Sequence, residues 1–289
     1  MPSTYAHYQF GQEVQKKLPE ELSSIISHHM PLYQIGLHGP DILFYYHALF
    51  PNSVNHMAYR IHEKKASYFI RKSLVTLKNL SNPEAGLAYM FGFICHFALD
   101  SECHSYIEFK VRQNGITHTE IETDFDRRLL LDAGKDPVRT CLTGHIHPSS
   151  EDCEIIAAFF PYITPKQIAR SLSSMIHYHW LLLAPGKIKR FFVLLLLRLT
   201  GNYKEMHGLL MTKQPRAGCE DSTRELLRRS RHAIPIALQL CENYYNVFCE
   251  MDVLSQRFYR TFEADSTEVR QYENQLKEPN LYEEPIKAN

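Results

Sequence analysis

Residues 92–106, GFICHFALDSECHSY, place three side chains that can bind a metal at intervals of four: His96, Asp100 and His104. Positions four apart on an α-helix are stacked neighbours, so Asp100 would lie beside each histidine. At ~100° per residue, the two histidines diverge by roughly 80°. A carboxylate between two diverging imidazoles can bridge two metal ions. The spacing therefore predicts a site that holds more than one ion.

A second pair with the same four-residue step follows in ITHTEIETDFD, where His118 and Glu122 would share one face of the next helix. Asn114 and Gly115 between the two stretches are a turn signal. A core aspartate satisfied by hydrogen bonds is the alternative to a metal site. A buried carboxylate needs a positive partner, however, and a divalent ion supplies that charge. We therefore expect the two faces to fold back toward each other around zinc, for which histidine and carboxylate are ordinary ligands.

Further ligands are expected nearer the start of the chain. Asp41 follows a Gly-Pro turn in IGLHGPDILFYY, where the alternative is a helix cap. His56 and His62 both lie in NHMAYRIHEKKASYF, and the choice between them stays open, with His62 favoured because it would open a helix. If Met1 is removed, the secondary amine of Pro2 stands five residues from His7.

Other histidines are expected to support the site or to face solvent. His38 precedes Asp41 in LHGPD and could orient that carboxylate through a hydrogen bond, with a simple turn role as the alternative. His145 and His147 alternate in a loop before a helix cap. Solvent exposure or a supporting contact is expected for this loop pair.

The elements that must position these residues are helical. Glycine is scarce, at 12 residues, and strand-like alternation is rare. No repeat or linker divides the chain, so we expect a single all-α multi-helix bundle over residues 1–263 and a polar, loosely packed tail over 264–289. Periodicity and cap signals predict helices over 62–80, from Pro83 through an apolar central stretch, from 118 to Gly134, and over 151–160, 165–183, 187–200 and 221–262.

Composition narrows the function classes. Lys+Arg and Asp+Glu total 32 each, so the basic excess of most nucleic-acid binders is absent. Seven scattered cysteines without a CxxC pair, and a start without a basic leader, lead us to expect a cytoplasmic protein with free thiols and no signal peptide. The apolar run 191–197 is far shorter than the ~20 residues of a membrane span. Basic residues beside it would suit peripheral membrane contact through 187–200, and burial against the core is the alternative.

The order and spacing of these candidate ligands resemble the bacterial zinc-dependent phospholipase C family, whose all-helical trinuclear scaffold the fungal zinc nucleases share. HFALDSECH and HTEIE look like the family's central signature, and the resemblance covers residues 2–125. It implies up to three Zn²⁺ ions, held in turn by Pro2, His7 and Asp100; by Asp41, His62, His96 and Asp100; and by His104, His118 and Glu122.

Two features of this chain depart from the secreted members of that family. Those enzymes begin with a tryptophan freed by signal cleavage, whereas here Pro2 would take that place. The gap between Asp100 and His104 is also shorter than usual, which would move or weaken the third zinc.

The resemblance implies a zinc-dependent phosphodiester hydrolase of the phospholipase C type. Zinc-bound hydroxide would attack in line, Asp100 would bridge two ions, and Asp41 would act as a ligand, a base or both. A phospholipid is the leading substrate, because a chain of zero net charge offers no electrostatic funnel for a polyanion. A zinc nuclease or phosphomonoesterase on the same scaffold, and a non-catalytic metal-binding protein, are the alternatives.

Overall fold

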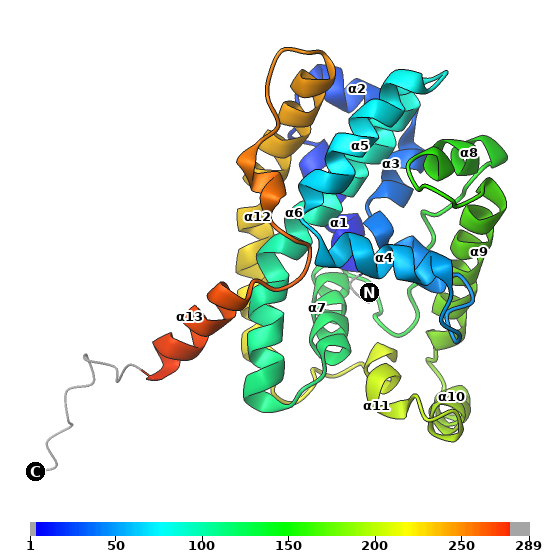
Figure 1. Ribbon diagram of the computed structural model, residues 1–289. Helices are drawn as coiled ribbons and strands as arrows, with labels where there is room; N and C mark the ends of the chain where they lie inside the picture. The colour runs from blue at the N-terminus through cyan, green and yellow to red at the C-terminus, as the bar shows by residue number, and fades with distance from the viewer. Residues whose placement is uncertain (1–3, 278–289) are drawn as a thin grey trace, which may run out of the picture.

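The computed structural model describes residues 4–277, and within that range all regular secondary structure is helical (Figure 1). The predicted all-α fold is therefore confirmed. In chain order the elements are α1 (Thr4–Gln15), α2 (Glu20–His28), α3 (Met30–Gly36), the 3-10 helix η1 (Gly39–Tyr45), α4 (Ser53–Glu63), α5 (Ala66–Asn79), α6 (Pro83–Asn114), α7 (His118–Asp132), α8 (Ser150–Ala158), α9 (Pro165–Leu182), α10 (Lys187–Leu199), α11 (Tyr203–Met206), η2 (His207–Leu209), α12 (Glu220–Phe248), η3 (Gln256–Tyr259) and α13 (Ser266–Lys277).

The 32-residue helix α6 is the centre of the molecule. Apolar side chains cover it on nearly every side, so it is stable only when other helices surround it. Helices α1, α3, α5, α7 and α12 pack against it, and Figure 1 shows it running through the body beside α12. Asn82 caps its start by accepting the Ala85 N–H, and Gly115 ends it in the left-handed conformation at φ 66°.

Helices α3 and α6 cross with their backbones in contact. A Cβ atom added to Gly36 would lie 2.2 Å from the Tyr89 carbonyl oxygen, and one added to Gly92 would lie 2.2 Å from the Tyr33 carbonyl oxygen. Only glycine permits so close an approach. Because α3 leads directly into η1 while α6 carries three of the predicted ligands, this crossing sets the distance between two segments of the expected metal site.

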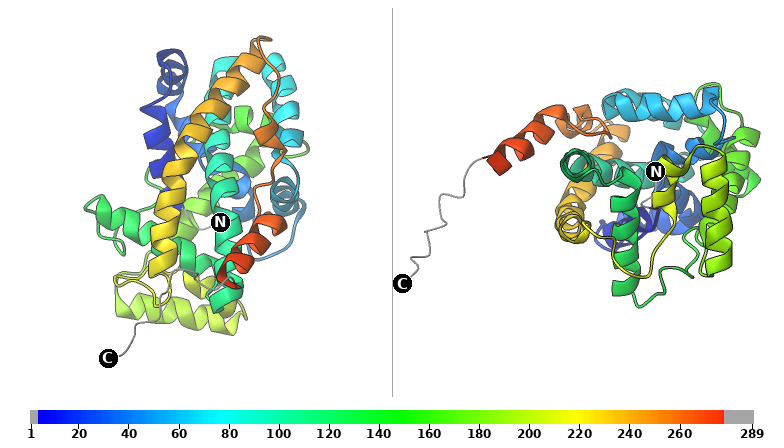
Figure 2. Two further views of the ribbon diagram at one scale, coloured as in Figure 1. Left: turned by 90° about the vertical axis from the view of Figure 1, so that its left-hand side faces the viewer. Right: turned by 90° about the horizontal axis from the view of Figure 1, so that it is seen from below.

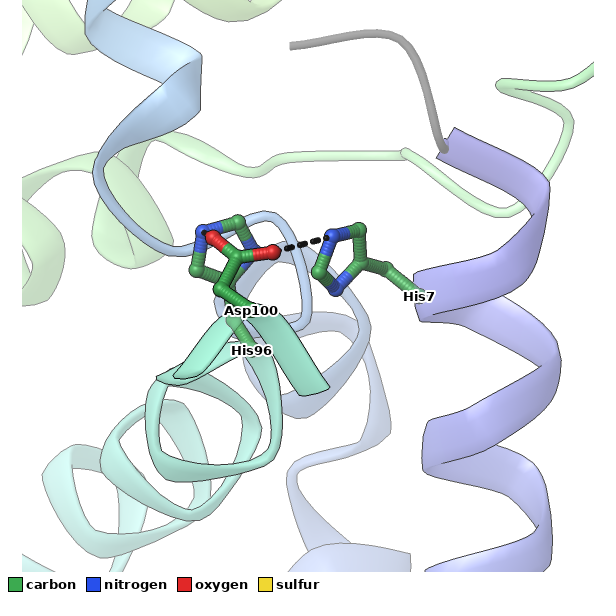
Figure 3. A group of neighbouring side chains, drawn as sticks. All are labelled: His7, His96 and Asp100. Atoms are coloured by element: carbon green, nitrogen blue, oxygen red, sulfur yellow. Dashed lines mark ion pairs between the residues drawn. The ribbon is translucent and has the colours of Figure 1, made fainter. Parts of the chain in front are cut away.

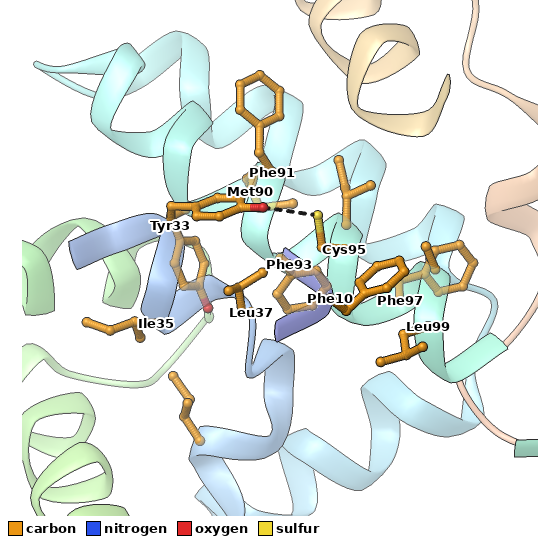
Figure 4. Close-up of a cluster of buried hydrophobic side chains, with 14 of the residues drawn as sticks. Phe10, Tyr33, Ile35, Leu37, Met90, Phe91, Phe93, Cys95, Phe97 and Leu99 are labelled. Carbon is orange, nitrogen blue, oxygen red and sulfur yellow. Dashed lines mark hydrogen bonds between the residues drawn. The ribbon is translucent and has the colours of Figure 1, made fainter. Parts of the chain in front are cut away.

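Apolar side chains fill the space between α1, α3 and α6 (Figure 4). Phe10, Leu37 and Phe93 are almost completely buried there. Tyr33 brings a hydroxyl into this core and donates it to the Gly11 carbonyl at 2.7 Å, so that the buried polar group is satisfied. The packed core holds α1 and α3 in fixed positions on α6.

The helix expected over residues 62–80 is divided in the structure. Lys64 and Lys65 adopt extended backbone angles, so α4 ends before them and α5 begins at Ala66. The Ala66 N–H donates to the carbonyl of Arg260 at 2.9 Å, a distant contact that local periodicity does not reveal. His62 therefore lies in the last turn of α4, and the expectation that it opens a helix was wrong.

The helix expected over 221–262 ends earlier than predicted. Glu250 has a φ of 62°, which stops the helical path just after α12. Phe258 and Phe262 then return to α6, where both are fully buried. The tail expected from residue 264 begins with α13, which packs on α6, and residues 278–289 lie outside the described residues. The boundary between residues 263 and 264 stays a prediction.

Candidate metal centre

Eight side chains with metal-binding atoms converge beside the middle of α6. They come from α1, η1, α4, α6 and α7, and all except His118 are buried. They form three groups, and within each group the potential ligand atoms lie within 4.8 Å of one another. The groups are His7, His96 and Asp100; Asp41, His62 and His96; and His104, His118 and Glu122.

The first group joins α1 to α6 (Figure 3). Nε2 of His7 lies 3.2 Å from Oδ1 of Asp100, and Nε2 of His96 lies 2.9 Å from Oδ2 of the same carboxylate. The two imidazole rings stack with their centroids 4.2 Å apart. Each oxygen of Asp100 therefore faces a different imidazole.

The second group adds η1 and the end of α4. Oδ1 of Asp41 lies 3.0 Å from Nε2 of His62 and 3.9 Å from Nε2 of His96. Gly39, which begins η1 at φ 49°, leaves room for the His96 ring, because a Cβ atom there would lie 2.4 Å from its Cδ2. His96 consequently belongs to both the first and the second group.

The third group comes from α6 and α7. A capping box formed by Thr117 and Glu120 fixes the start of α7 at His118, so Glu122 follows one turn later. Oε1 of Glu122 lies 3.1 Å from Nε2 of His118 and 3.7 Å from Nε2 of His104. The latter atom is also 3.6 Å from Oδ1 of Asp100. The short gap between residues 100 and 104 therefore leaves His104 within reach of both carboxylates.

Three of these imidazoles are oriented by backbone carbonyls that contact Nδ1, on the side of the ring away from the centre of the site. A carbonyl oxygen only accepts, so Nδ1 of each ring carries the hydrogen and Nε2 faces the centre. Histidine ligands are commonly oriented in this way in metal sites. The distances from Nδ1 to the carbonyl oxygen are 2.9 Å for His62 to Ala58, 3.3 Å for His96 to Leu37, and 2.8 Å for His104 to Phe262.

A cation fits between these side chains. Among the described residues, Oε2 of Glu122 is buried without a hydrogen-bond partner. A void of about 10 Å³ touches His7, Asp100 and His104, and a space of that size holds about one water-sized particle. A buried carboxylate is costly unless a positive charge compensates it, and the nitrogen and oxygen donors present are those that zinc prefers.

Asp100 and His104 shift each other's pKa. Burial alone would raise the pKa of Asp100, but the imidazoles of His96, His104 and His7 hold that pKa well below its ordinary value. Burial alone would lower the pKa of His104, but the carboxylates of Asp100 and Glu122 raise it to about 10. In the metal-free protein, Nε2 of His104 therefore carries a proton at neutral pH.

Zinc binding to the metal-free protein is expected to release a proton near neutral pH, because Nε2 of His104 must be deprotonated before it can bind a cation. For the same reason, zinc affinity should fall as the pH is lowered. Calorimetric titration in buffers of different ionisation enthalpy measures the number of protons released. His104→Gln should release fewer protons than the parent protein, and equal proton release by both would contradict the expectation.

His62, rather than His56, lies with the second group. His56 is exposed on α4, in the same helix but away from the three groups. We expect His62→Ala to weaken zinc binding by at least about 10- to 100-fold, the loss that is typical when only a residue orienting a metal ligand is removed. His56→Ala is the matched control and should keep the zinc content of the parent protein. Metal analysis after purification without chelator measures both, and equal zinc loss in the two variants would contradict this assignment.

His38 contacts Asp41 through its backbone. Its carbonyl accepts the Asp41 N–H at 3.0 Å, whereas its ring faces His145, with the two Nε2 atoms 2.7 Å apart. The His145 ring also stacks on Tyr8 at 4.1 Å. Burial and the neighbouring His145 imidazole hold the pKa of His38 well below its ordinary value. Both imidazoles are therefore neutral at neutral pH. Through the stacking of His145 on Tyr8, the pair connects the start of η1 to α1.

Asp126 has a positioning role that the sequence analysis missed. Its carboxylate accepts the backbone N–H groups of Tyr5 at 3.1 Å and Ala6 at 2.8 Å, and so fixes the start of α1 next to His7. It extends the four-residue step of His118 and Glu122, which is the signal that could have found it. The predicted ligand Pro2 lies outside the described residues.

Comparison with known proteins identifies one family. The family model described as zinc dependent phospholipase C matches residues 6–163, more than half of the 289-residue chain. Searches of the curated proteins and of the solved structures found no match. The matched range contains every member of the three groups and ends before α9.

Proposed function

Since this chain belongs to the zinc-dependent phospholipase C family, we propose that it hydrolyses the head-group phosphodiester of phospholipids with up to three zinc ions. The observation that carries the proposal is the position of Asp100. Its carboxylate lies 2.9 Å from Nε2 of His96, 3.2 Å from that of His7 and 3.6 Å from that of His104. A carboxylate among three imidazoles supports a cluster of ions rather than a single ion.

The proposed ligands follow the three groups. Asp100 would bind the ion of the first group and also lies close to His104 of the third group. His96 belongs to both the first and the second group. Pro2 remains the predicted partner of His7. The proposed assignment is thus Pro2, His7 and Asp100 for one ion; Asp41, His62, His96 and Asp100 for the next; and His104, His118 and Glu122 for the last.

The chain's own residues would bind the ions, keep them at a fixed separation and accept a proton during the reaction. When bound, zinc supplies a Lewis acid that activates water near neutral pH and neutralises charge on phosphoryl oxygens. Asp100 would keep neighbouring ions at a fixed separation, because α6 holds it rigidly. Asp41 is oriented by the 3.0 Å contact with His62 and could accept a proton as well as bind metal.

Metal analysis combined with a panel of phosphoesters tests the proposal. Protein purified without chelator or added metal should contain zinc and should convert a phospholipid to diacylglycerol and a phosphorylated head group. Turnover of single-stranded DNA or a mononucleotide, without turnover of any phospholipid, would instead indicate a nuclease or phosphomonoesterase. Bound zinc without turnover of the whole panel would indicate a non-catalytic metal-binding protein.

A further inference from the structure

Helix α10 presents an apolar face to solvent. Of its residues, only Val193 and Leu197 are buried. A surface helix normally turns polar side chains to water, so a contiguous apolar face marks an interaction surface. In Figure 2, α10 lies across one end of the body. The large apolar side chains on it that are exposed, by 37% to 77%, are Ile188, Phe191, Phe192, Leu195, Leu196 and Leu199.

Basic residues lie on α10 and on the segment that follows it. Residues 181–204 contain no aspartate or glutamate, and their five basic residues are Lys187, Lys189, Arg190, Arg198 and Lys204. Lys189 donates to the carbonyls of Trp180 and Leu183, both at 2.9 Å, and lies over the exposed Trp180 ring at 4.4 Å. Basic side chains, an exposed tryptophan and an apolar face together are the features by which interfacial helices bind anionic bilayers.

A cavity of about 200 Å³ lies beside the buried side of α10. Val193 and Leu197 line it together with leucines at the end of α9, so its wall is mainly apolar. Ala48 and Leu196 line it and are also exposed, so it opens at the surface next to the apolar face.

The same cavity reaches the elements that carry the candidate metal ligands. Tyr45 lines it four residues after Asp41 in η1, and Asp126 lines it four residues after Glu122 in α7. The cavity therefore lies between α10 and two of the elements that carry candidate metal ligands.

The length of α10 decides how it can meet a bilayer. Its 13 residues are fewer than the ~20 that a membrane span requires. None of the helices in residues 4–277 combines the length and the apolar character needed to cross a membrane. A short helix with a wide apolar face lies in the plane of the bilayer surface instead.

We propose that α10 docks on the surface of an anionic phospholipid bilayer, and that the cavity beside it takes up part of one acyl chain of the lipid whose head group reaches the metal centre. This inference rests on the proposed function and names where its substrate would enter. The elements that form the docking face, α9 to α11, follow the residues matched to the family model.

Vesicle co-sedimentation tests the docking face, using the zinc-loaded full-length protein and vesicles of phosphatidylcholine with or without phosphatidylserine. The parent protein should bind the acidic vesicles more tightly than the neutral ones. The double variant Phe191→Glu/Leu199→Glu should bind acidic vesicles at least about tenfold more weakly, since it loses apolar contact and gains negative charge. Val75→Glu is the matched control, because Val75 is an equally exposed apolar residue, at 63%, on α5.

Equal binding by the double variant and the parent protein would overturn the docking proposal, as would failure of the parent protein to bind acidic vesicles. Light scattering that shows a dimer of the parent protein and a monomer of the double variant would overturn it too, by assigning the face to a second copy of the chain. Vesicle binding requires no turnover. Docking without hydrolysis of any phospholipid would therefore contradict the proposed function but would still support the docking proposal.

Ala48→Trp tests the acyl-chain cavity, because a large ring at this exposed lining position would block the opening without disturbing the core. The readout is the ratio of kcat/KM for a long-chain phospholipid in mixed micelles to kcat/KM for a soluble short-chain phospholipid. Loss of a few buried methylene contacts should lower this ratio by about tenfold. An unchanged ratio would overturn the assignment of the cavity to an acyl chain.

Discussion

Asp100→Asn is expected to remove most of the bound zinc and to lower kcat/KM for phosphodiester hydrolysis by about three orders of magnitude or more. The low pKa of Asp100 means that the carboxylate is ionised, and its charge faces three imidazoles. Asparagine has nearly the same shape but no charge. It would also turn an amide NH₂ group toward either His7 or His96, where a cation is expected.

Asp132→Asn serves as the matched control for that variant. Asp132 is an exposed aspartate on α7 that pairs with Arg128 at 2.8 Å, so its replacement should leave zinc content and activity unchanged. The zinc-to-protein ratio, kcat/KM and the far-UV circular dichroism spectrum should be measured for both variants. A folded Asp100→Asn protein with full zinc and full activity would end the proposed mechanism.

Gly92→Ala is expected to lower the free energy of unfolding by about 3 kcal/mol or more. The added methyl group would lie 2.2 Å from the Tyr33 carbonyl oxygen, and a backbone atom inside a packed helix pair cannot move aside cheaply. Relief of the clash would push α3 away from α6. Because η1 follows α3 directly, Asp41 would move relative to His96, and zinc binding should weaken as well.

Chemical denaturation in the presence of a chelator measures this loss without the contribution of bound metal. Gly144→Ala is a suitable control, because the nearest atom to its added methyl group, the Cys141 carbonyl oxygen, is 3.8 Å away. This control should change stability by less than about 1 kcal/mol. Equal stability of Gly92→Ala and Gly144→Ala would show that the helix crossing tolerates a side chain at residue 92.

The sequence revealed those parts of the site that depend on helical spacing. His96, Asp100 and His104 lie on one helix, and His118 and Glu122 lie on another, so the four-residue step alone predicts which side chains share a face. The all-α fold followed from the same periodicity. Helix ends were less predictable, because the break at residues 64–65 is stabilised by a contact with residue 260.

Contacts between residues far apart in the chain could not be predicted. His145 meets His38 across 107 positions, and Asp126 meets Tyr5 across 121. Nothing in the local pattern of either partner specifies the other. The first contact depends on how the loop after α7 packs beside the start of η1, and the second depends on how α1 and α7 pack around α6. The same limitation applies to the apolar face of α10, whose exposure depends on what the rest of the chain leaves uncovered.

The hydrogen bond from His104 to the Phe262 carbonyl has a consequence for biosynthesis. Phe262 follows His104 by 158 positions and lies well beyond the residues matched to the family. A growing polypeptide on the ribosome therefore exposes His96, Asp100 and His104 long before the group that orients the last of these rings has been made. The cluster can therefore reach its final arrangement only after residue 262 has been translated and has left the ribosome.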